Sequence, residues 1–258
     1  MYDAKVSTRT KLHYINTIRQ KLCSNPERLK LFKNTVFGRW LQIKTYEHDN
    51  HLLHYLLQHQ RPVENPNINT PMYFDIWGKS IEFRREDMCL VLGFRFGDVS
   101  LEHLRKRQSG FGKRILNFLR ERRTEKISNI KAEHLFRILV DNVEFDELSN
   151  DDAVRVCLLL FLENIFMGKQ ERNLISNEIL VLVDDFYAWN AFPWGEYIWV
   201  EFHKRVYNAL SKVRDRHLLE IASKGDRYTA TYTLCGFAFA LKVRIIHNYN
   251  DFNISCLT

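Results

Sequence analysis

The sequence predicts a mainly α-helical fold with a small β-hairpin, an α+β chain that forms a compact multi-helix globular domain. Its hydrophobic share of 45% is too high for a disordered chain and is enough for a sizeable core. Only 10 glycines and 5 prolines occur in 258 residues, which is few for a protein built on many tight turns. Most apolar residues recur at spacings of three and four, as on one face of a helix.

At the start of the chain we predict an N-terminal helical extension over residues 1–34, followed by a single mostly helical domain over residues 35–258. Ser7 is placed to cap a first helix that reaches about Cys23. The pair Asn25-Pro26 then starts a second helix, because proline favours the first helical position.

One segment has the alternation of a β-hairpin. Residues 72–76 and 80–83 are strand-like and flank the turn Trp77-Gly78-Lys79, after an Asn- and Pro-rich loop at 63–71. Helices are predicted on either side, over 51–59 and 84–92, and Gly93 ends the second of them.

The later helices begin with Ser149, which is followed by acidic residues in a first helical turn. This helix is predicted to run to Met167 and is apolar almost all round, so we expect it to be the buried centre of the fold. Another helix is predicted from Ser176 to about Asn190. Residues 234–245 fit either a strand or a helix, and their alanines favour a helix.

Charge is distributed in blocks along the chain. Residues 1–46 carry a net charge of +8, residues 101–132 carry +7 and residues 133–201 carry −10. Two interpretations follow. A polarised surface would steer an anionic partner, whereas basic and acidic regions that pack side by side would neutralise each other.

The strongest functional feature is the basic segment 105–126. Clusters of this kind are typical of nuclear import signals and nucleic-acid patches. Gly110 and Gly112 would let the backbone approach a phosphate, whereas the alternative is a solvated face of a helix. The candidate nucleic-acid-binding residues are Arg105, Lys106, Arg107, Lys113, Arg114, Arg120, Arg122 and Arg123.

A second candidate set could bind a protein. Trp194, Tyr197 and Trp199 lie close together in an aromatic segment that Pro193 opens. Exposed Trp and Tyr side chains are the usual anchors of protein interfaces. The alternative is that these three aromatic residues belong to the core.

Signals for catalysis and for metal binding are weak. The histidines at 48, 51, 54 and 59 could include zinc ligands, but the leucines between them favour a packed helix with a solvated polar face. Cys235 has apolar flanks, which favours an inert thiol over a nucleophile. Phosphate-binding loops and serine elbows are absent from the sequence. We therefore expect no enzyme activity, no cofactor and no metal.

Several spaced motifs carry a resemblance to a known family. They are the hairpin with Trp77-Gly78-Lys79, the segment Leu92 to Gly97, the acidic helix start followed by Phe166-Met167-Gly168, the Pro193-Trp194-Gly195 run and the segment Tyr232 to Phe237. Over roughly residues 35–247 the chain resembles the plant domain-of-unknown-function family nineteen-eighty-five. The resemblance implies a nuclear, transposon-derived recognition module that often precedes a SUMO-protease-like cysteine protease domain, and it implies no catalytic residue here.

These observations predict a non-enzymatic protein-interaction module of nuclear context, with a protein partner of unknown identity. The alternative is a DNA- or RNA-binding domain that uses segment 105–126, and a hydrolase is a distant third. The expected location is the nucleus, with the cytoplasm as the alternative. We expect no membrane span, because the longest apolar run is residues 156–162, whereas a spanning helix needs about 20 residues. Five widely spaced cysteines indicate reduced thiols.

Overall fold

The computed structural model describes residues 2–43, 50–76, 78–124, 126–225 and 228–244. The chain divides into two compact units that alternate along the sequence. Unit 1 comprises residues 1–10, 47–97 and 193–258, and unit 2 comprises residues 11–46 and 98–192. Residues 1–34, expected as one extension, are therefore shared between the two units.

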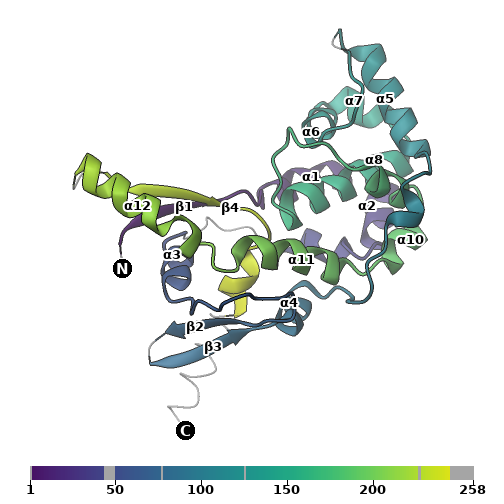
Figure 1. Ribbon diagram of the computed structural model, residues 1–258. Coiled ribbons are helices and arrows are strands. Elements are labelled where there is room, and N and C mark those ends of the chain that lie inside the picture. Colours follow the sequence, from purple (N-terminus) through teal and green to yellow (C-terminus); the bar gives the residue numbers. More distant parts are fainter. Residues whose placement is uncertain (1, 44–49, 77, 125, 226–227, 245–258) are drawn as a thin grey trace. The chain divides into compact units, whose positions relative to one another are not determined.

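Unit 1 combines short strands with helices, and its labelled elements can be followed in Figure 1. They are β1 (Ala4–Thr8), α3 (Asn50–Gln58), β2 (Met72–Ile76), β3 (Lys79–Phe83), α4 (Arg85–Leu92), α11 (Trp194–Val206), α12 (Ser211–Lys224) and β4 (Ala230–Leu234).

The predicted hairpin is confirmed. Strands β2 and β3 pair antiparallel, with Phe74 opposite Ile81. Gly78 has a φ of +72°, which favours glycine in this tight turn. Trp77 lies outside the described residues. Helix α4 follows and ends at Gly93, which is left-handed with a φ of +66° as the sequence predicts.

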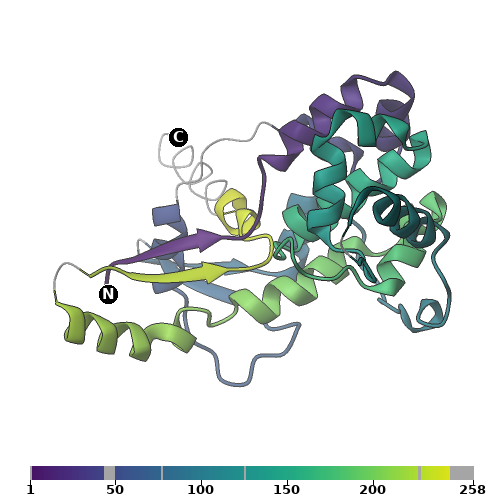
Figure 2. The same ribbon diagram turned by 90° about the horizontal axis from the view of Figure 1, so that it is seen from above.

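The helix predicted from Ser7 is wrong at its start. Residues 4–8 form β1, which pairs in parallel with β4, and the two strands lie side by side in Figure 2. Ala4 and Val6 are buried, whereas Lys5 and Ser7 are exposed. The partner strand lies 226 residues away along the chain, so no local pattern indicates the pairing.

Unit 2 contains helices, and no labelled strand, among the residues that the structure describes. Its elements are α1 (Tyr14–Cys23), α2 (Pro26–Lys33), the 3-10 helices η1 (Gly38–Gln42) and η2 (Glu102–Leu104), α5 (Gly110–Arg122), α6 (Ala132–Val140), α7 (Asn142–Glu147), α8 (Asn150–Leu160), the π-helix η3 (Phe161–Phe166), α9 (Asn177–Leu182) and α10 (Phe186–Ala191).

The buried central helix is confirmed, and it forms the core of unit 2. Helix α8 packs against α2 and α6, and every residue from 152 to 167 is buried. Its last turns widen into the π-helix η3. The Phe161 and Phe166 rings pack against Phe37, whose ring also meets Trp189 edge-on.

Two later predictions are refined by the structure. The single helix expected over 176–190 is two helices, because Asp185 accepts hydrogen bonds from the first backbone N–H groups of α10 and so begins a new helix there. In the ambiguous C-terminal segment, residues 239–244 are helical, as the alanines favour. None of the described helices is long and apolar enough to cross a membrane.

Candidate nucleic-acid interface

The first turn of α5 lies in the middle of the predicted basic segment. Ser109 caps it by accepting a hydrogen bond from the Gly112 N–H at 2.8 Å, and the same hydroxyl donates to the Leu180 carbonyl at 2.7 Å. The N–H groups of Gly110 and Phe111 donate to the two oxygens of Asp184 at 2.9 and 2.7 Å. The expected phosphate position is therefore filled by a carboxylate of the chain itself, which suits the positive end of the helix dipole equally well.

Most arginines of the segment are paired with acidic side chains of the block 133–201. The Arg114 guanidinium donates to both oxygens of Asp152 at 2.7 and 2.8 Å, and Arg123 does the same to Glu144 at 2.6 and 2.7 Å. The remaining contacts are an Arg122–Glu147 pair, an Arg105–Glu178 pair at 3.5 Å, and a hydrogen bond from Arg120 to the Ile127 carbonyl. Within unit 2 the basic and acidic blocks thus pack side by side and neutralise each other.

Asp152 is the most enclosed acid of this set. Its carboxylate is 8% exposed and also accepts from Arg155 at 2.8 Å. Burial opposes its ionisation, but the hydrogen bonds from Arg114 and Arg155 outweigh burial and hold the pKa of Asp152 below its usual value. The same bond raises the pKa of Arg114. This pair is part of the fold of unit 2.

Several basic side chains of the segment remain exposed, and three of them lie just before or within the first turn of α5. Among the described residues, Lys106, Arg107 and Lys113 have no acidic partner. The loop that carries the first two is fixed by the Asn177 side-chain amide, which donates to the Arg107 carbonyl at 2.9 Å. We call these three residues the α5 group.

A second exposed basic cluster comes from the N-terminal block of charge +8. Lys30 and Lys33 lie three residues apart on α2 and so share one side of the helix. Gly38 packs so closely on Lys33 that a Cβ there would overlap the Lys33 backbone, which places Arg39 beside the end of α2. All three cations are exposed and have no acidic partner in the described parts of the chain.

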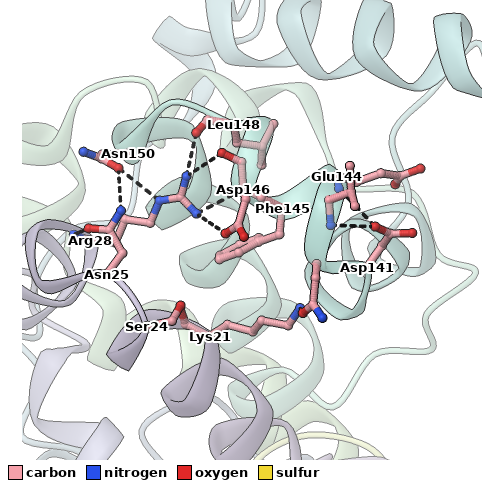
Figure 3. A network of polar contacts seen from close by, with 12 residues as sticks. Lys21, Ser24, Asn25, Arg28, Asp141, Glu144, Phe145, Asp146, Leu148 and Asn150 are labelled. Carbon is pink, nitrogen blue, oxygen red and sulfur yellow. Dashed lines mark hydrogen bonds and ion pairs between the residues drawn. The ribbon is translucent and has the colours of Figure 1, made fainter.

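Helix α2 is held in place by a buried arginine on its opposite side (Figure 3). Arg28 is 4% exposed, and its guanidinium donates to the Asn150 side chain at 3.0 Å and to the carbonyls of Phe145 and Leu148 at 3.1 and 2.7 Å. It also bonds the Asp146 carbonyl at 3.2 Å. A guanidinium group has five donors in a fixed planar arrangement, so this network fixes the orientation of α2 against the end of α7 and the start of α8.

An exposed aromatic ring lies on α10, a helix that is hydrogen-bonded to the chain at the end of α2. The Asn190 side chain accepts from the Val36 N–H at 2.8 Å and donates to the Asn34 carbonyl at 3.3 Å, so α10 lies beside the end of α2. Tyr187 is one helical turn before Asn190, on the same side of α10, and is 83% exposed. We define the α2 surface as Lys30, Lys33, Arg39 and Tyr187.

Sequence reasoning missed the α2 surface, although one signal for it was available. The N-terminal net charge of +8 indicates a basic region, but Tyr187 belongs to the acidic block. Only the hydrogen bonds of Asn190 to the segment after α2 bring the helix that carries Tyr187 to the end of α2.

The aromatic residues predicted as protein anchors are mostly core residues of unit 1. Trp194 and Trp199 are 0% and 1% exposed, and Tyr197 is half-buried. The Trp199 ring packs on Phe83, and its Nε1 donates to the Ile68 carbonyl at 3.0 Å. Of the two interpretations, the core alternative holds for Trp194 and Trp199, because α11 buries the side that carries them, and these two residues are not exposed anchors.

The residues considered for chemistry are dispersed. His54 is 7% exposed and hydrogen-bonds the Tyr232 hydroxyl at 2.8 Å, so it is not on a solvated face. His48 lies outside the described residues. Cys235 is a half-buried free thiol. Within the described part of the chain, no three His, Cys, Asp or Glu side chains are grouped to hold a metal ion.

These features define a mainly helical α+β protein with an exposed basic and aromatic surface. Residues 62–205 match the family described as "Domain of unknown function (DUF1985)", and the chain belongs to this family. The matched range is shorter than residues 35–247, over which the sequence resembles the family, and it does not include α2. No curated protein and no solved structure matches the chain.

Proposed function

We propose that this protein is a non-enzymatic recognition module that binds single-stranded nucleic acid through the α2 surface. The observation that carries the proposal is the exposed Tyr187 on α10, a helix that is hydrogen-bonded to the end of α2, where three exposed cations have no acidic partner among the described residues. Proteins that bind single strands combine cations that follow the phosphates with aromatic rings on which bases stack. The positive charge at the end of α2 is tolerated without a ligand because the negative end of the helix dipole lies there.

The test is the binding of a labelled random-sequence single strand, followed by fluorescence anisotropy over a range of salt concentrations. We expect the triple variant Lys30→Glu, Lys33→Glu and Arg39→Glu to bind at least about tenfold more weakly, with a shallower salt slope, since each lost phosphate contact reduces the slope by about 0.7. Its matched control is Lys106→Glu, Arg107→Glu and Lys113→Glu, which changes the charge equally and also breaks no ion pair.

Tyr187→Ala tests the stacking part of the proposal. We expect it to weaken binding about fivefold or more with an unchanged salt slope, and Tyr187→Phe to bind like the unmodified protein. Equal losses in the two triple variants would mean that net charge alone attracts the strand. The absence of binding even at low salt would reject the proposal. A nuclear location goes with this proposal and is checked by imaging the tagged protein.

A protein-interaction module is the second candidate, and one observation in unit 1 favours it. Helix α12 buries only His217 among its 14 residues, while Leu218 and Leu219 are 43% and 72% exposed. Exposed leucines on a helix surface are typical of docking sites for a partner. Affinity capture with the unmodified protein and with Leu218→Ser/Leu219→Ser would show partners that only the former retains.

A further inference from the structure

Unit 1 contains a cavity of about 210 Å³ between the end of α3 and the start of α12. One wall is apolar and consists of Leu57, Pro62 and Leu210. A cavity of about 150 Å³ can already hold a benzene ring. The cavity therefore has room for a small organic molecule with one polar group.

The polar part of the lining includes hydrogen-bond donors. Gln60 is 9% exposed, and its side-chain oxygen accepts from the Asn208 N–H at 3.1 Å. Its amide nitrogen is buried and has no hydrogen-bond partner within the described residues. A buried donor without an acceptor is costly, and a ligand oxygen would remove this cost.

A cation and a helix start add to this donor. Arg214 lines the cavity, is exposed and has no acidic partner in the part of the chain that the structure describes. Ser211 is the first residue of α12, and the preceding Leu210 provides no side-chain cap. The hydroxyl of Ser211 and the positive end of the helix thus lie at the cavity beside Arg214.

The remaining side of the cavity is rigidly positioned by a polar cluster. The Tyr2 carbonyl accepts from His54 Nε2 at 3.0 Å and from the Gln58 amide. The Tyr2 hydroxyl bonds His217 Nδ1 at 2.8 Å. Since Tyr2 and Gln58 both line the cavity, its shape is set before any ligand enters.

We propose that this cavity binds a small organic carboxylate, with its apolar body against Leu57, Pro62 and Leu210. Its carboxylate meets Arg214, the Ser211 hydroxyl and the Gln60 amide. A planar carboxylate suits the two parallel donors of one guanidinium group. A phosphate dianion carries more charge than a single arginine balances, so the lining favours the monoanion. The site lies in unit 1 and is independent of the α2 surface.

The experiment uses benzoate as the probe, with benzyl alcohol and benzylamine as neutral and cationic analogues of similar size. Binding to the full chain is followed by protein-observed NMR titration. We expect benzoate to bind at least about tenfold more tightly than benzyl alcohol, because a charged hydrogen bond is stronger than a neutral one, and benzylamine not to bind.

Arg214→Met should weaken benzoate binding about tenfold and leave benzyl alcohol binding unchanged. Arg216→Met is the matched control, because a residue two positions along a helix faces elsewhere. Both positions are exposed, so both variants should keep the thermal midpoint of the unmodified protein. Equal affinity for benzoate and benzyl alcohol, equal loss in the two arginine variants, or no binding of benzoate would each overturn the proposal.

Discussion

Helices α5 and α2 both present basic residues in unit 2, but the two helices use their charge differently. On and after α5, Arg114, Arg122 and Arg123 are paired with acids of the block 133–201. On α2, Lys30 and Lys33 remain exposed, and the one buried cation bonds backbone carbonyls. A run of basic residues is therefore available to an external anion only where the fold leaves it without acidic partners.

The largest expected effect comes from the buried cation that positions α2. Arg28→Ala should lower the free energy of unfolding by about 3 kcal/mol or more, because several buried acceptors lose their donor together. Urea denaturation measures this change. The exposed neighbour serves as the control, since Lys30→Ala should change stability by less than about 0.5 kcal/mol. Similar small effects in both variants would show that the Arg28 network does not hold α2.

The next effect concerns the acid that pairs with α5. Asp152→Asn should cost about 2–4 kcal/mol at neutral pH, because Arg114 and the mostly buried Arg155 lose their carboxylate. Asp151→Asn, at a side chain that is 54% exposed, should cost less than about 0.5 kcal/mol.

The cost of Asp152→Asn should depend on pH in a definite direction. The pKa of Asp152 is lowered in the folded protein. Its contribution is therefore complete above the unfolded pKa of about 4 and is lost as pH falls through the lower folded pKa. Urea denaturation of both proteins at a series of acidic pH values measures the difference, which should shrink below about pH 4. A difference that stays constant would mean that the ion pair does not stabilise the fold.

The smallest effect is expected when the arginines near the end of α5 lose their acidic partners, which makes them resemble the unpaired cations of α2. Glu144→Gln with Glu147→Gln should cost about 1 kcal/mol per pair, because both pairs are only partly buried, with 12% and 45% of the glutamate side chains exposed. Single-strand binding should strengthen about threefold and its salt slope should steepen, since two arginines become available to phosphates. Anisotropy titrations against the unmodified protein measure both quantities. Unchanged binding would mean that something other than pairing keeps α5 from contacting the strand.

The features that were predicted correctly from the sequence depend on a few neighbouring residues. The hairpin turn, the Ser149 cap, the left-handed Gly93 and the apolar continuity of α8 are all visible locally, because turn geometry, capping and burial each act over one or two helical turns. The family resemblance likewise rested on local motifs.

Which groups from distant parts of the sequence come into contact depends on the tertiary structure. The parallel pairing of β1 with β4, the acids that neutralise α5, and the position of α10 beside the end of α2 all join segments far apart in sequence. Trp194 and Trp199 could have been anchors or core, and the packing of α11 made them core. The physical reason is that charge and hydrophobicity are properties of single residues, whereas pairing and exposure depend on what the fold places next to them.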